Sequence, residues 1–123
     1  MTFLVWRRVH RLATGTIALF AALHSVLTFL LYETWSPDSV WFLGTGLGLL
    51  LLAAMNWSHV GLEPCDLPTA PVIRWANVCF VLFGVGAVLA VAEPQAFLIL
   101  AALVIQAAAG FVTLRPRNVT LQG

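Results

Sequence analysis

The chain has 123 residues, of which 61% are hydrophobic and only 9% are charged. Soluble domains carry about 25% charged residues, so a chain this apolar cannot cover a water-facing surface. A net charge of +1 without a long basic stripe excludes an electrostatic nucleic-acid surface. Composition therefore predicts an integral membrane protein, a single domain over residues 1–123, that contacts the lipid bilayer and no nucleic acid.

Apolar runs of roughly 20 residues recur along the chain, the length that crosses a hydrocarbon layer of about 30 Å. They cover residues 12–32, 39–57, 72–92 and 95–114. Pro37 and the proline-rich stretch 58–71 separate the first three runs, and Pro94 is suited to open the fourth. The predicted fold is an all-α membrane protein, an antiparallel bundle of four transmembrane helices.

The basic residues indicate the orientation. Arg7, Arg8 and Arg11 precede the first run, Arg74 begins the third, and Arg115 and Arg117 follow the last. The loops on the other side carry Glu33, Asp38 and Glu93 and no lysine or arginine. By the positive-inside rule, both termini are expected to be cytoplasmic. The pattern resembles that of small multi-pass proteins of the bacterial inner membrane, which is the location we expect.

Helical periodicity gives each predicted span one small or polar face and one larger apolar face. Small residues allow close approach of helices in lipid, and polar side chains form hydrogen bonds between them. The predicted packing glycines are Gly44, Gly48, Gly84 and Gly110, and the polar residues on these faces include Thr14, His24, Thr28, Thr45, Asn56, Asn77, Gln106 and Thr113. Gly46 falls on the side opposite Gly44 and Gly48 and has no predicted packing role. An alternative use of Gly44 and Gly48 is a contact between two copies of the chain.

Depth along the helices indicates which polar groups can meet. Asn56 and Asn77 both fall near the cytoplasmic edge, so a hydrogen bond between them is expected. His24 and Gln106 both fall near the midplane of the bilayer. His24 either bonds a neighbour such as Gln106 or Tyr32, or serves as a ligand or proton site, because ionisable groups inside a membrane often mark function.

Cofactor and catalytic signatures are weak. A haem needs axial ligands on facing helices at one depth, whereas His10 and His59 lie at the cytoplasmic margin, far from His24. One chain therefore cannot supply two midplane histidines, although a homodimer that pairs two copies of His24 could. The metal-capable residues of the middle loop match no zinc spacing and predict a solvated loop; they are His59, Glu63, Cys65 and Asp66. Cys79 is expected to be a small apolar filler. We therefore predict no catalytic residues, no metal and no cofactor.

Two functional hypotheses remain. The first is a binding or accessory subunit that packs with a partner protein, a lipid or a quinone-like molecule, as the small-residue faces and the lack of catalytic groups suggest. The alternative is a small oligomeric transporter or channel that uses a midplane polar site containing His24 and Gln106. Thr28 and Thr45 would line the same path. Both hypotheses allow a homo-oligomer or membership of a larger membrane complex, and an enzyme is the least favoured class.

Overall fold

The computed structural model describes residues 2–60 and 69–114 of the chain. These residues form α1 (Phe3–Leu31), α2 (Pro37–Val60), α3 (Thr69–Val91) and α4 (Pro94–Thr113). Each helix is long and apolar enough to cross a membrane. The chain is therefore an all-helical, multi-pass membrane protein, as its composition predicts.

Helix bounds differ from the apolar runs at the start of the chain. The first run begins at residue 12, but α1 begins at Phe3 and includes Arg7, His10 and Arg11. Hydropathy marks the part of a helix that matches the hydrocarbon layer, whereas the backbone hydrogen bonds of the helix continue beyond it. This extension matters because it places His10 on a packed helix surface, where its ring is fully buried.

Residues at the helix ends determine where α2 and α4 begin and where α3 ends. Ser36 and Ser39 form a reciprocal cap at the start of α2, in which each side-chain oxygen accepts from the backbone N–H of the other residue, at 3.2 and 2.9 Å. Pro37 is the first residue of α2 and Pro94 the first of α4, where proline is tolerated because no helical donor is lost. Ala92 ends α3 in the left-handed region, with φ of 52°.

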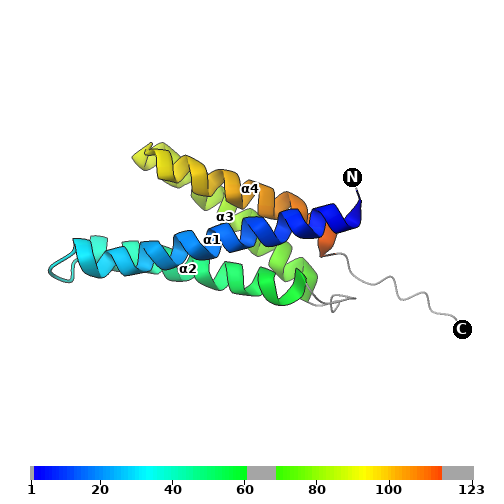
Figure 1. The fold of residues 1–123 in the computed structure, drawn as a ribbon. Helices are drawn as coiled ribbons and strands as arrows, with labels where there is room; N and C mark the ends of the chain where they lie inside the picture. Colours follow the sequence, from blue (N-terminus) through cyan, green and yellow to red (C-terminus); the bar gives the residue numbers. More distant parts are fainter. Residues whose placement is uncertain (1, 61–68, 115–123) are drawn as a thin grey trace, which may run out of the picture.

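The helices are arranged as two hairpins. α1 pairs with α2, α3 pairs with α4, and α1 also packs against α4, whereas α2 and α3 contact each other much less. In Figure 1 the hairpins meet near the start of α1 and the end of α4 and diverge toward the other end. We call the first the closed end, around His10 and Asn56, and the second the open end, around Asp38 and Glu93.

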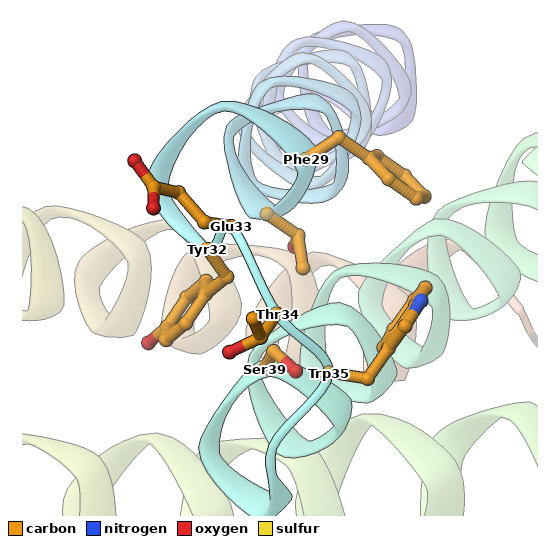
Figure 2. A pocket seen from close by; sticks show the side chains of 7 residues that line it. Phe29, Tyr32, Glu33, Thr34, Trp35 and Ser39 are labelled. Carbon is orange, nitrogen blue, oxygen red and sulfur yellow. The ribbon is translucent and has the colours of Figure 1, made fainter.

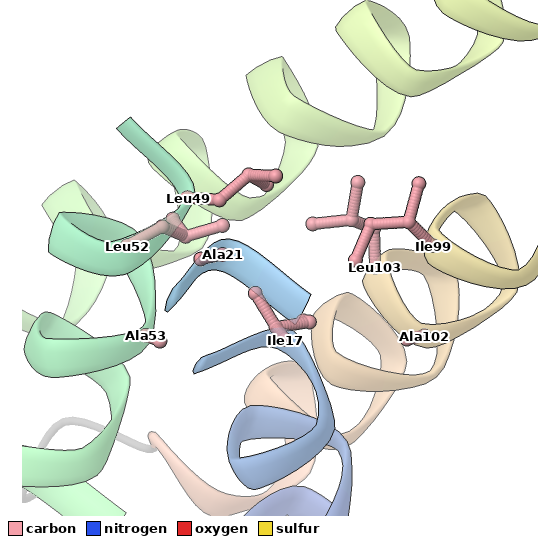
Figure 3. Packing of buried hydrophobic residues seen from close by; sticks show 8 residues of the cluster. All are labelled: Ile17, Ala21, Leu49, Leu52, Ala53, Ile99, Ala102 and Leu103. Carbon is pink, nitrogen blue, oxygen red and sulfur yellow. The ribbon is translucent and has the colours of Figure 1, made fainter. Parts of the chain in front are cut away.

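Between the two ends, a small apolar core joins three of the helices (Figure 3). It consists of Ile17 and Ala21 from α1, Leu49, Leu52 and Ala53 from α2, and Ile99, Ala102 and Leu103 from α4. From α3, the side chains of Phe80 and Val81 pack against it while remaining partly exposed. Large apolar side chains elsewhere are exposed, for example Leu89 at 81% and Leu98 at 71%. In a bilayer such side chains face lipid, so their exposure costs nothing.

The glycines of α2 differ from the sequence expectation. A Cβ atom at Gly46 would collide with Ser25 Oγ and lie 3.1 Å from the Ser25 nitrogen and 3.2 Å from the Ala21 oxygen. A Cβ atom at Gly44 would have no neighbour within 4 Å, and one at Gly48 would make an ordinary contact with the Phe80 ring at 3.4 Å. The close crossing of α1 and α2 is therefore at Gly46, and the placement of Gly44 in a close contact within the chain is wrong.

The reason lies in the face of α2 that meets α1. Its buried residues Gly46, Leu49, Ala53, Asn56 and Val60 follow the alternating spacing of three and four that marks one helix face. This face mixes large and small side chains, so grouping α2 by small and polar residues selects the neighbouring face instead. On α3 a Cβ at Gly84 would lie 3.2 Å from the side chains of Leu100 and Leu103, and on α4 one at Gly110 would lie 3.1 Å from Asn77 Nδ2.

Candidate functional site: a buried polar network and a cleft

Asn56 is the centre of a fully buried set of hydrogen bonds at the closed end. Its Nδ2 atom donates to Asn77 Oδ1 at 2.8 Å, and Asn77 Nδ2 donates back to Asn56 Oδ1 at 3.0 Å. The second hydrogen on Asn56 Nδ2 goes to the Leu52 carbonyl oxygen of its own helix, at 2.9 Å. The two amides thus form the paired contact between α2 and α3 that their matching depth predicts.

Further polar groups extend this pair to the other two helices. Gln106 Nε2 on α4 donates to Asn77 Oδ1 at 3.1 Å, and Thr14 Oγ1 on α1 donates to Gln106 Oε1 at 2.9 Å. His10 Nε2 lies 2.9 Å from Asn56 Oδ1, and His10 Nδ1 lies 2.6 Å from Thr113 Oγ1. We call the six residues His10, Thr14, Asn56, Asn77, Gln106 and Thr113 the polar network.

The polar network ties all four helices together where the hairpins meet. Each interhelical hydrogen bond in a membrane contributes about 0.6 kcal/mol on average, so their number matters more than any single one. Gly110 leaves the space for this arrangement, because a Cβ there would lie 3.1 Å from Asn77 Nδ2 and 3.8 Å from the His10 ring. The polar network joins the hairpins at the closed end. Among the described residues, no equivalent set of hydrogen bonds joins them at the open end.

The second feature is a cleft of about 380 Å³ between the hairpins, toward the open end. Side chains from all four helices line it, and most are apolar, including Phe20, Trp41, Phe83, Ala87 and Ile99. The polar members are His24, Thr45 and Gln95, and the acidic ones are Asp38 and Glu93. Its size is within the range of ligand sites, which are about 300–1,000 Å³ and mostly apolar with a few polar groups.

His24 forms part of one wall of the cleft. Its imidazole is stacked on the Phe42 ring with 3.6 Å between centroids, and the Phe20 ring lies 5.8 Å away. Thr45 lines the same space, and its hydroxyl donates to the Trp41 carbonyl oxygen of its own helix at 2.9 Å. The wall therefore combines flat aromatic surfaces with a histidine that can donate or accept a hydrogen bond.

Two further features flank the cleft. A cavity of about 190 Å³ lies at the connection between α1 and α2, where Figure 2 shows Phe29 and Trp35 on one side and Tyr32 and Glu33 on the other. Thr28 also lines this cavity, and its hydroxyl donates to the His24 carbonyl oxygen at 3.2 Å. A groove between α2 and α3 is lined by Gly44, Gly48, Phe80 and Cys79, among others.

The predicted site residues thus belong to three separate features: the polar network, the cleft and the cavity beside the cleft. Asn56, Asn77 and Gln106 belong to the polar network, whereas His24 and Thr45 line the cleft and Thr28 the cavity beside it. The bond to Gln106, one of the alternatives for His24, is not formed, because Gln106 bonds Thr14 and Asn77 while the His24 ring stacks on Phe42. No single site contains both His24 and Gln106.

His10 is the functional candidate that sequence reasoning placed elsewhere, at the membrane margin. A signal was present, because His10, Thr14, Ile17 and Ala21 follow helical spacing and continue the buried face of α1 before residue 12. For metals, the described residues contain no group of three or more histidine, cysteine, aspartate or glutamate side chains that could hold an ion. Glu63, Cys65 and Asp66 of the predicted solvated loop lie outside the described residues.

Comparison with known proteins supplies no relative. No protein-family model matches the chain, and no curated protein or solved structure matches it. The functional argument therefore depends on the polar network and the cleft. On the evidence of its four apolar helices, the chain is a small integral membrane protein of the multi-pass type.

Proposed function

We propose that this protein is an antiparallel four-helix bundle of the bacterial inner membrane that binds a lipid- or quinone-like molecule in the cleft. Arg7, Arg8 and Arg11 on α1 fall at the closed end, and Asp38 and Glu93 fall at the open end. The positive-inside rule then supports a cytoplasmic closed end with both termini on that side. The cleft would open in the outer half of the membrane.

The cleft is the observation that carries this proposal. It lies between two hairpins made of membrane-spanning helices, and its lining is largely apolar. An apolar molecule dissolved in the bilayer could enter between the hairpins without crossing water. A volume of about 380 Å³ accommodates a substituted ring or part of an acyl chain, rather than a whole phospholipid.

The position of His24 favours a flat molecule that carries an oxygen acceptor. Phe42 and Phe20 provide aromatic surfaces beside the imidazole, and aromatic rings pack well against another flat ring in stacked or edge-on geometry. An imidazole N–H can donate to a carbonyl oxygen such as that of a quinone. The transporter alternative is less well supported, because Gln106 is occupied within the polar network and does not line the cleft.

Tryptophan fluorescence provides the test, because Trp41 lines the cleft. A short-chain benzoquinone, which quenches indole fluorescence on contact, is titrated into the protein in detergent micelles. We expect saturable quenching. His24→Leu should raise the half-saturating quinone concentration by about five- to tenfold, since one hydrogen bond contributes about 1 kcal/mol.

A matched pair of tryptophan variants separates binding beside Trp41 from partitioning into the micelle. Trp41→Phe should remove the saturable part of the quenching. Trp57→Phe, on the same helix but outside the cleft lining, should retain it. Quenching that rises linearly with quinone and is shared equally by both variants would mean simple partitioning into the micelle, and the proposal would be wrong.

A further inference from the structure

The hydrogen bonds of His10 determine where its protons can be. Asn56 Nδ2 faces the Leu52 carbonyl oxygen, which can only accept, so the Asn56 amide cannot be turned around without opposing two oxygens. Asn56 Oδ1 therefore faces His10 Nε2, and as an acceptor it requires a hydrogen on that nitrogen. The Nε2–H bond is fixed by the polar network.

The other ring nitrogen has a partner that can change role. Thr113 Oγ1 lies 2.6 Å from His10 Nδ1 and also 2.9 Å from the Ala109 carbonyl oxygen. When Nδ1 is bare, the Thr113 hydroxyl hydrogen can point to it. When Nδ1 carries a hydrogen, Thr113 Oγ1 can accept that bond while its own hydrogen points to Ala109. Every donor is paired in both cases.

We propose that His10 is a proton-binding site of this protein, with Thr113 as the residue that makes both protonation states compatible with the same packing. A hydronium ion gives its proton to the lone pair of Nδ1 and leaves as water, and the Thr113 hydroxyl hydrogen turns from Nδ1 to the Ala109 oxygen. No covalent bond within the protein other than the new N–H forms, and the rest of the polar network keeps its hydrogen bonds. The site is distinct from the cleft, so this inference does not depend on the proposed ligand.

The positive charge of a protonated His10 ring would face neutral hydrogen-bond acceptors rather than a carboxylate. The ionisable groups near His10 are Arg7, Arg8 and Arg11 on α1, His59 on α2 and Arg74 on α3, and α4 has none between Pro94 and Thr113. The carboxylates within the described ranges are Glu33, Asp38 and Glu93, which lie toward the open end. A charged His10 therefore relies on two oxygens, those of Asn56 and Thr113.

A route for the proton is present beside the ring. His10 itself is fully buried, but Thr113 is only partly buried and lies at the last residue of α4. Its hydroxyl can receive a proton from solvent at the closed end and pass it to Nδ1, since the same oxygen both donates and accepts. Among the described residues, Thr113 is thus the part of the polar network that is nearest to the closed end and partly exposed there.

Nuclear magnetic resonance of the full chain with ¹⁵N-labelled histidine, in lipid nanodiscs, tests the proposal directly. His24→Gln and His59→Gln variants identify the His10 signals. We expect Nε2–H with a bare Nδ1 at alkaline pH, and protonation of Nδ1 on acidification while Nε2–H and the Asn56 and Asn77 amide signals stay in place. A bare Nε2 at alkaline pH, or a ring that stays neutral until the bundle unfolds, would overturn the proposal.

Two variants of Thr113 test the role of its hydroxyl. Thr113→Val keeps the side-chain shape but removes the oxygen that accepts from protonated Nδ1, whereas Thr113→Ser retains it. Because bonds to charged groups are stronger than neutral ones, Thr113→Val should lose about 4 °C more in Tm than wild type on acidification. Thr113→Ser should follow wild type. Equal acid sensitivity of Thr113→Val and wild type would contradict the assignment.

Discussion

Gly46→Ala should lower the free energy of unfolding of the bundle by about 1–3 kcal/mol, the usual cost of overpacking. The added methyl group would collide with Ser25 Oγ and press on two backbone atoms of α1, the Ser25 nitrogen and the Ala21 oxygen. A serine hydroxyl can rotate away, but the backbone atoms can move only if α1 and α2 separate. Reversible unfolding by increasing denaturing detergent, followed by circular dichroism, measures the change.

Gly44→Ala is the matched control, two residues earlier on the same helix. A Cβ atom there has no neighbour within 4 Å, and alanine is the better helix former by about 1 kcal/mol. This variant should be as stable as wild type or more stable. If the two variants changed stability equally, the close crossing at Gly46 would be refuted. A loss of stability in Gly44→Ala alone would instead support the close contact at Gly44 that the small-residue pattern predicts.

Asn56→Leu is expected to destabilise the protein through the polar network. The substitution removes the bond with His10 and both bonds with Asn77. At about 0.6 kcal/mol for each interhelical bond, the loss is about 2 kcal/mol, and stranded polar groups can raise it. The same unfolding measurement applies, and the separation of α2 from α3 should also expose the adjacent core to proteolysis at the closed end.

The control for this prediction is Thr45→Val, which removes a hydroxyl that donates only within α2. Its effect should be within about 0.5 kcal/mol. The double variant Asn56→Leu with Asn77→Leu should cost less than the sum of the two single variants, because neither amide is then left without its partner. Additive losses would show that the two amides act independently, which would contradict their pairing in the polar network.

Much of the fold is readable from the sequence because the bilayer imposes simple rules. Twenty apolar residues make a span, proline and charge mark its ends, and depth along two spans shows which polar groups can meet. The Asn56 and Asn77 pair follows from those rules. The membrane location itself follows from composition alone.

The remaining features depend on information that hydropathy lacks. Lipid and protein interior are both apolar, so a pattern of leucines and glycines does not distinguish the face of α2 that meets α1 and predicts no role for Gly46. His10 lies beyond the apolar run and looks solvated, although α1 continues through it. The cleft arises from the angle between two hairpins, a property of the whole bundle that no single span encodes.

The central claim is that the cleft between the hairpins holds a molecule taken from the membrane, and mass spectrometry of the purified protein tests it most directly. Wild type is extracted in mild detergent and compared with Ala87→Trp, which fills the cleft, and Gly86→Trp, whose added side chain starts in open space outside the lining. We predict one lipid- or quinone-like species in near-stoichiometric amount with wild type and Gly86→Trp, and its loss from Ala87→Trp. A species retained equally by all three, or none with any, would contradict the claim.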